Sequence, residues 1–123
     1  MPSKDVLRVV MRRFGQRLRI RKAVFVYRKL HKAEPEAVEI MTYSGVKIEI
    51  LRPGDWLKLF DDVYGIFGDE DIAFVVREWC DGCKSATVAA ELNAMARRTF
   101  YEKNRMFFGF ALGLAVERGL VHF

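Results

Sequence analysis

The stretch DEDIAFVVREWCDGCKSATVAAELNAMARRTFYEKNRMFFGFALGLAVERGLV, residues 69–121, decides the fold of this chain. Its first three residues are acidic, and apolar residues then recur at helical spacing from Ile72 to Trp79. Acidic side chains suit the first turn of a helix, because the helix dipole is positive there. The pattern therefore predicts a helix over residues 72–79. A buried strand leading into the two cysteines that follow is the competing interpretation.

Two further helices are predicted after the cysteine pair. Ser85 or Thr87 can cap a short helix, whose inward positions would be Val88, Leu92 and Met95. A third helix is predicted to begin near Arg97 or Thr99 and to stop at Gly119. It carries a long apolar stripe made of Phe100, Phe107, Phe108, Ala111, Leu112, Ala115 and Val116.

Before this stretch, the sequence predicts a basic amphipathic helix followed by a strand. Apolar residues of segment 5–18 recur at helical spacing with arginines between them, and Gly15 weakens the pattern. Segment 19–30 alternates enough to predict a strand, in which Phe25 and Tyr27 are expected in the core.

A β-hairpin and one more helix are predicted next. Segment 37–51 alternates on both sides of a Ser44-Gly45 turn, which is typical of a hairpin. Asp55 is expected to cap a helix that Gly68 ends. The whole chain of 123 residues is expected to form a single domain. Residues 1–53 would supply the basic helix and hairpin, and residues 54–123 the helical portion.

The formal charge is distributed unevenly along the chain. Residues 1–33 hold eleven basic and one acidic side chain, a charge of +10, whereas residues 34–83 carry −8 and residues 84–123 carry +3. The basic residues of the first segment include Arg12, Arg13, Arg17, Arg19, Arg21 and Lys22. Guanidinium and ammonium groups neutralise phosphates and release counterions, so this segment is a candidate arm for binding nucleic acid. A solvated helix face and a helix lying on a membrane surface are the alternatives.

Four segments of the C-terminal part carry a resemblance to a known family. They are IAFVVREW at 72–79, TVAAEL at 87–92, ARRTFYEKNR at 96–105 and ERGLV at 117–121. Together they resemble the winged helix-turn-helix family of DNA-binding domains, although the turn at 93–96 lacks the glycine often found there. The resemblance covers about the last 55 residues and implies a winged-helix-like three-helix unit there. With the basic helix and the small antiparallel hairpin or sheet predicted from the residue patterns, we expect an α+β fold. In the family, the last segment leads into the first wing strand.

The same resemblance implies a non-catalytic, regulator-like function in binding double-stranded DNA. The third helix would enter the major groove with its first turns at base edges and phosphates. Carried over by position, the contacting residues are Arg97, Arg98, Thr99, Tyr101, Lys103, Asn104 and Arg105. Arginine and asparagine can make bidentate contacts to guanine and adenine. The alternative is that these residues are only the exposed start of a core helix.

The second half of the third helix predicts a homodimer. Its residues Met106, Phe110 and Leu114 lie off the main apolar stripe. Gly109 and Gly113 are spaced to let another helix approach closely. A homodimer would suit a two-fold DNA site. A deeply buried helix in a monomer is the alternative.

A thiol-disulfide redox protein is the alternative function. The segment WCDGCK, residues 79–84, is similar to the active-site segment of thioredoxins, which would make Cys80 and Cys83 the reactive pair. No proline follows Cys83, so the cis-proline of that family could be supplied only in a circularly permuted fold.

The sequence gives little support for other classes of function. There is no phosphate-binding glycine loop and no GxSxG motif, and neither histidine has zinc-ligand spacing with the cysteines. We therefore expect no metal and no cofactor. The longest apolar run has eleven residues, too few to span a bilayer, and an intracellular, cytoplasmic location is expected. A module that binds an acidic protein partner stays open as a third function.

Overall fold

The computed structural model describes residues 4–82 and 85–122, which form a mostly helical α+β fold. These residues contain six helices and one two-stranded antiparallel hairpin. In chain order the elements are α1 (Lys4–Gly15), α2 (Arg17–His31), β1 (Ala37–Met41), β2 (Lys47–Leu51), α3 (Pro53–Phe67), α4 (Asp71–Cys80), α5 (Ala86–Leu92) and α6 (Arg97–Glu117). The predicted hairpin and the helices after it are confirmed.

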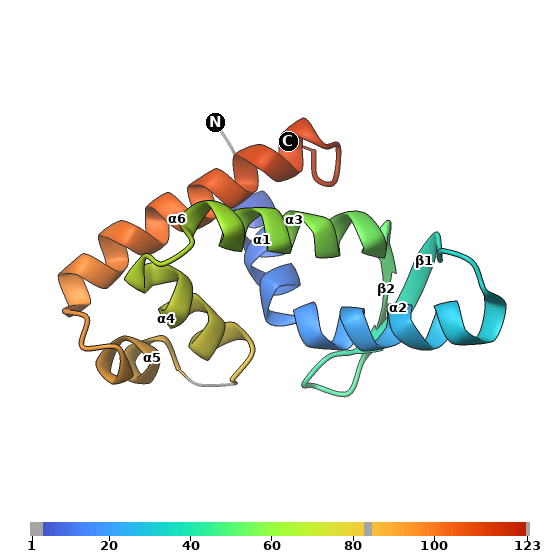
Figure 1. The fold of residues 1–123 in the computed structure, drawn as a ribbon, viewed down its shortest axis with the longest axis horizontal. Helices are drawn as coiled ribbons and strands as arrows, with labels where there is room; N and C mark the ends of the chain where they lie inside the picture. Colours follow the sequence, from blue (N-terminus) through green and yellow to red (C-terminus); the bar gives the residue numbers. More distant parts are fainter. Residues whose placement is uncertain (1–3, 83–84, 123) are drawn as a thin grey trace.

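The molecule is elongated, and its two ends are built from different parts of the chain (Figure 1). Helices α4 and α5 lie with the beginning of α6 at one end, and α2 lies with the hairpin at the other. Helices α1 and α3 occupy the middle, where α6 runs past them. The start of α6 therefore lies at one end of the molecule, whereas the predicted basic arm follows α1 and the first turns of α2 in the middle.

The strand predicted over residues 19–30 is wrong, because this segment belongs to helix α2. Helix α1 ends at Gly15, and the buried Gln16 starts a second helix. Ile20 and Val24, one turn apart, are buried, whereas Phe25 is 57% exposed and was wrongly expected in the core. The β-branched and aromatic residues of α2 favour a strand, but burial of one helical face outweighs that preference.

The predicted hairpin is formed, and it pairs Ala37 with Leu51 and Met41 with Lys47. Its turn contains Gly45 at φ +82°, a backbone conformation that glycine adopts without a Cβ clash. The side chains of Val38, Ile40 and Ile50 are buried on one face of the hairpin. Because side chains alternate along a strand, the opposite face carries Glu39 and Glu49.

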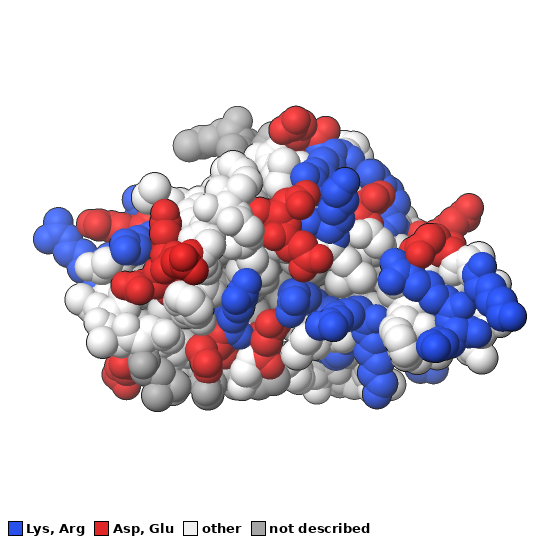
Figure 2. All heavy atoms as spheres, viewed as in Figure 1, with Lys and Arg blue, Asp and Glu red and all other residues white. Residues whose placement is uncertain are grey.

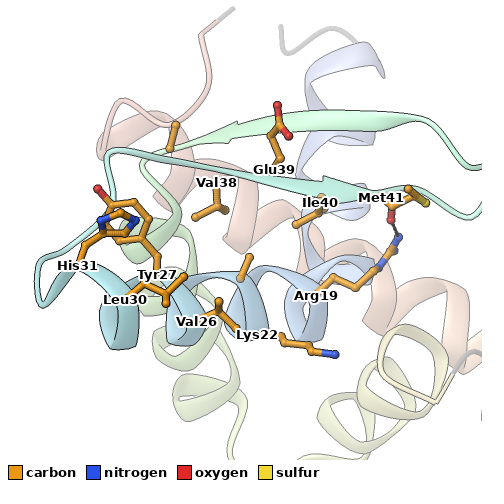
Figure 3. Close-up of a pocket in the computed structure, with 12 residues that line it drawn as sticks. Arg19, Lys22, Val26, Tyr27, Leu30, His31, Val38, Glu39, Ile40 and Met41 are labelled. Carbon is orange, nitrogen blue, oxygen red and sulfur yellow. Dashed lines mark hydrogen bonds between the residues drawn. The ribbon is translucent and has the colours of Figure 1, made fainter.

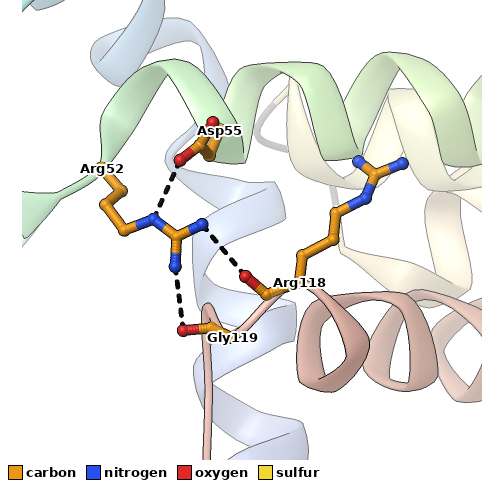
Figure 4. A network of polar contacts seen from close by, with 4 residues as sticks. All are labelled: Arg52, Asp55, Arg118 and Gly119. Atoms are coloured by element: carbon orange, nitrogen blue, oxygen red, sulfur yellow. Dashed lines mark hydrogen bonds and ion pairs between the residues drawn. The ribbon is translucent and has the colours of Figure 1, made fainter.

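Helix α3 begins two residues before the predicted cap. Asp55 was expected to cap it, but the helix starts at Pro53, and Asp55 lies in its first turn. Proline suits this first position because it has no N–H to leave unpaired. The Arg52 side chain donates to Asp55 Oδ2 from Nε at 2.9 Å and to the carbonyls of Arg118 and Gly119 at 3.0 Å each (Figure 4). Arg52 thus ties the start of α3 to the end of α6.

The ring of Phe14 lies at the centre of the core. Its centroid lies 4.8 Å from that of Phe60 and 5.6 Å from that of Tyr64, both on α3. Phe107 and Phe108 on α6 lie 5.5 and 5.4 Å away. A single residue at the end of α1 therefore joins the middle helices to the long C-terminal helix.

The C-terminal three helices pack around Trp79. Its ring lies edge-on to Phe100 at 6.3 Å and to Phe108 at 5.9 Å, which fixes α4 against α6. Ser85 caps α5 as predicted, because its Oγ accepts the backbone N–H of Val88 at 3.2 Å. Val88 was wrongly expected to point inward, since its side chain is exposed. Ala89 and Ala90 of α5 are buried instead, and the side chain of Leu92, also expected to point inward, lies outside the described part of the structure.

The chain after α6 turns without starting a strand. Gly119 has φ +70°, and its N–H donates to the carbonyl of Val116 at 3.0 Å, so it ends the helix as predicted. Residues 118–122 contain no strand. The wing strand that the resemblance implies is therefore not formed in the described residues.

Candidate nucleic-acid interface

The two helices α5 and α6 meet through a short turn of residues 93–96. Ala94 in this turn has φ +53°, the left-handed conformation that usually favours glycine. Met95 is buried, and its N–H donates to the carbonyl of Ala90 at 2.9 Å. The turn therefore holds the start of α6 against the end of α5, although the sequence supplies alanine instead of glycine at the left-handed position.

The predicted DNA-contacting residues of α6 divide into an exposed set and a half-buried set. The exposed residues are Arg97, Arg98, Tyr101 and Arg105, and the half-buried ones are Thr99, Lys103 and Asn104. The side chain of Arg98 is 92% exposed and pairs only loosely with Glu102, at 3.5 Å. On the opposite side of the helix, Phe100 is buried in the core. The first turns of α6 thus present cationic and aromatic side chains outward on an anchored helix.

Asn104 has a polar atom without a partner. Its Oδ1 is buried and makes no hydrogen bond with another described residue. A buried carbonyl oxygen without a donor is costly, and a ligand or a water molecule that donates to it would remove the cost. Asn104 lies one turn after Tyr101, next to the exposed face.

Three of the six predicted basic-arm residues are engaged inside the molecule. Arg13 is half-buried, donates to Gln16 Oε1 at 2.8 Å and has its pKa lowered by burial and by Arg12. Arg17 pairs with Asp81 Oδ2 at 2.9 Å. Arg19 donates to the carbonyl of Met41 at 2.5 Å and stacks over the ring of Tyr43 at 4.4 Å. These three side chains support the fold, so they are less available to a phosphate.

The other three predicted arm residues, Arg12, Arg21 and Lys22, are exposed. Lysine and arginine side chains gather over the end of the molecule where α2 lies (Figure 2). Helix α2 contains six basic residues and no acidic one. The basic surface of α2 and the start of α6 form two separate regions, and the structure does not bring the predicted residues into one site.

A cluster around Asp81 was not anticipated from the sequence. Arg17 and Arg77 lie over the ring of Tyr64, with centroid distances of 5.8 and 4.7 Å. Burial raises the pKa of Asp81 above its ordinary value, although Arg17 and Arg77 oppose the shift. Arg17 and Asp81 are 64 residues apart, and no local pattern could mark them as partners.

The position of Cys80 gives thiol-disulfide chemistry no support. Cys80 is the last residue of α4, whereas a reactive thiolate is favoured at a helix N-terminus. Burial, followed by the charge of Asp81, raises the pKa of its thiol to about 12. Its predicted partner Cys83 lies outside the described residues, and within these Cys80 forms no disulfide. A protonated, inward thiol is a poor nucleophile.

The outer side of α6 carries the apolar residues predicted to form a dimer. Met106 is 67% exposed, and Phe110 is also exposed, whereas Leu114 is partly buried. Apart from the adjacent backbone of α6 itself and the two chain neighbours, a Cβ built on Gly109 or Gly113 would meet no described atom within 4 Å. This side of α6 is therefore open to close approach by another helix.

The remaining chemistry of the described residues is limited. They contain no group of three or more histidine, cysteine or acidic side chains placed to hold a metal ion. None of their helices is both long and apolar enough to cross a membrane. Comparison of the chain with protein-family models, curated proteins and solved structures found no match.

Proposed function

We propose that this protein binds double-stranded DNA through the first turns of α6 and has no catalytic role. The observation that carries the proposal is the exposed side of an anchored helix that follows a short turn. Helix-turn-helix proteins insert the first residues of such a helix into the major groove while the preceding helix crosses the backbone. Here α5 would be the preceding helix and α6 the inserted one.

The exposed residues of α6 have the chemistry that this geometry requires. Arg98, Tyr101 and Arg105 are spaced three and four residues apart, so they share one side of the helix. Arginine can donate two hydrogen bonds to guanine, and tyrosine can donate to phosphates or stack. Arg97 and Lys103 would contact the flanking phosphates. Glu102 is the one acidic residue in these turns. Its ion pair with Arg98 is weak, so Arg98 can leave Glu102 to contact a base.

The basic surface of α2 contributes in a different way in this proposal. Because it lies away from the start of α6, it cannot read the same base pairs. Its exposed cations Arg21 and Lys22 would raise the local concentration of DNA through long-range attraction. We expect their effect to be independent of DNA sequence and to fade with added salt.

A homodimer is part of the proposal, with the outer side of α6 as its interface. If two copies crossed antiparallel between Met106 and Gly113, a rise of about 1.5 Å per residue would separate their Arg98 residues by roughly 35 Å along the helices. One turn of B-form DNA is about 34 Å, the usual spacing of two half-sites. The arrangement would allow both copies to reach successive major grooves on one side of a duplex.

Titration of fluorescent duplex DNA tests the proposal, with the salt concentration varied. Two double variants, each removing two exposed positive charges, are compared: Arg97→Ala/Arg98→Ala on α6 and Arg21→Ala/Lys22→Ala on α2. We expect the α6 variant to lose affinity by about tenfold or more and to bind a selected sequence no better than random DNA. The α2 variant should weaken binding to all duplexes alike. Absence of binding at low salt, or equal losses from both variants, would contradict the proposal.

A further inference from the structure

The outward side of α2 carries apolar and basic residues together. Four exposed residues follow one another at spacings of four, three and four, and so form one line along the helix: Leu18, Lys22, Phe25 and Lys29. At about 100° per residue, this line lies opposite Ile20 and Val24, which are buried. The two apolar members of the line are 46% and 57% exposed. Two apolar side chains therefore lie in water beside two lysines.

The hairpin does not cover this side of α2. Val38 and Ile40 point from β1 toward α2, whereas Lys22 extends away from the strands (Figure 3). A groove of about 630 Å³ lies between α2 and β1, and neither Leu18 nor Phe25 lines it. The outward side of α2 is thus a separate surface from the side that faces the hairpin.

A hollow of about 420 Å³ lies along the outward side of α2, next to α3. It is lined by three apolar and three basic residues, namely Leu18, Phe25, Leu57, Arg21, Lys22 and Arg28. None of the described residues that line it is acidic. Arg28 binds Glu34 at 2.6 Å, so its charge is largely balanced, whereas Arg21 and Lys22 are exposed. The hollow therefore combines apolar walls with a positive charge.

This combination of apolar and basic side chains indicates what binds there. Duplex DNA would attract the cations, but it gives Leu18 and Phe25 no apolar medium to enter. A second copy of the chain, placed on the same side of α2, would bring two sets of cations together. An anionic bilayer offers both kinds of contact, because acidic headgroups lie directly above the acyl chains. Lys29 suits this arrangement, since its Nζ lies 5.5 Å from the centroid of the Phe25 ring and can stay at the headgroups while the ring enters the acyl region.

We propose that the outward side of α2 docks on the surface of a membrane that contains anionic lipids. The helix lies in the plane of the surface, with Leu18 and Phe25 below the headgroups. Lys22 and Lys29 contact the headgroup phosphates, and Arg21 extends this basic contact toward α3. The activity belongs to α2 and does not rest on DNA binding by α6.

Sedimentation of the full chain with lipid vesicles tests the proposal. Vesicles of phosphatidylcholine alone are compared with vesicles that also contain about 30% phosphatidylglycerol, at the same salt concentration. We expect binding to the anionic vesicles to be at least about tenfold stronger, and inorganic phosphate at constant ionic strength to leave it unchanged. Equal binding to both kinds of vesicle would overturn the proposal. Displacement by inorganic phosphate would also overturn it, because the surface would then bind a free anion.

A double variant separates insertion of apolar side chains from attraction of charge. Leu18→Ser/Phe25→Ser removes the apolar contacts and keeps every cation. Its matched control, Ile66→Ser/Val88→Ser, removes two similarly exposed apolar residues, 61% and 43% exposed, from α3 and α5. We expect the α2 variant to bind anionic vesicles about tenfold more weakly and the control to bind as the original chain does. Equal binding by the two variants would overturn insertion.

Insertion of Phe25 also has a spectroscopic signature. Phe25→Trp should be quenched by lipids brominated in their acyl chains, whereas Ile66→Trp, at a similarly exposed position of α3, should not. The native Trp56 and Trp79 contribute the same background to both variants. Equal quenching of the two variants would contradict the proposed orientation.

The last comparison distinguishes a membrane from other anionic partners. Leu18→Ser/Phe25→Ser should leave binding to single-stranded DNA and to polyglutamate unchanged. Weaker binding to either one, with vesicle binding intact, would overturn the proposal in favour of a nucleic acid or an acidic protein. Arg97→Ala/Arg98→Ala should keep its vesicle binding and lose only DNA binding, so failure of one proposal can be told from failure of the other.

Discussion

The start of α6 and the N-terminal basic segment both carry several cations, yet these cations do different things. At the start of α6, Arg97, Arg98 and Arg105 are exposed and little engaged. In the N-terminal segment, Arg17 and Arg19 bind groups of their own chain. Sequence charge alone ranks the N-terminal segment higher, at +10 for residues 1–33. Charge density along the sequence therefore does not tell which cations are available to a ligand, because availability depends on the partners that each cation finds inside the molecule.

The largest effect is expected at Phe14, the ring that connects the middle helices to α6. Phe14→Ala leaves a cavity among four aromatic neighbours and should lower the free energy of unfolding by about 3–5 kcal/mol. Denaturant unfolding measures the change. Phe25→Ala, at an exposed position of α2, should change stability far less. If the two ends of the molecule form one cooperative unit, both lose structure in a single transition; separate transitions would show that they unfold independently.

A smaller effect on stability is expected from substitution of Arg17, a cation that is paired inside the molecule and not available to a ligand. Arg17→Ala removes the partner of Asp81, a carboxylate only 22% exposed, and should cost about 1–3 kcal/mol of stability with DNA affinity nearly unchanged. Arg12→Ala, which removes an exposed charge from α1, should stay within about 0.5 kcal/mol. A strong loss of DNA affinity with little loss of stability in Arg17→Ala would reverse this distinction.

The same variant has a predicted pH dependence. Burial raises the folded-state pKa of Asp81 above its ordinary value of 3.8. The protonated form is thus favoured by folding, and this contribution is present below the ordinary pKa and lost as the pH rises through the folded value. Without Arg17 the pKa should rise further. The stability deficit of Arg17→Ala should therefore be larger near neutral pH than at about pH 3, which unfolding curves at both values would measure.

Local patterns predicted most of the fold but not the internal partners. The acidic start at residues 69–71 and the spacing up to Trp79 identified α4, and strand alternation identified the hairpin. Helix α2 was missed because Val24, Val26 and Tyr27 favour strands, and only their tertiary environment shows that one helical face is buried. Charge patterns also could not separate engaged from available cations.

The exposed side of α6, which forms the candidate site, could be predicted from the sequence. The groove between α2 and β1 could not. The spacing of Phe100, Phe107 and Phe108 fixes which side of the helix is buried, and so which side carries Arg98 and Tyr101. The groove depends on α2 lying beside β1, a relation between two elements that no single pattern contains. It was also hidden by the wrong strand prediction for α2.

The smallest effect on stability is expected from substitution of Ala94, in the turn before α6. Ala94 holds φ +53°, where its Cβ crowds the backbone, so Ala94→Gly should relieve strain and raise stability by about 0.5–1 kcal/mol. Ala89→Gly, inside α5, should instead lower it by about 1 kcal/mol or more, because it loosens a helix and removes a buried methyl group. Thermal unfolding separates the two signs. Because the glycine leaves the path of the turn unchanged, Ala94→Gly should keep the affinity for duplex DNA; a stable variant with altered DNA affinity would mean that the alanine methyl group itself shapes the start of α6.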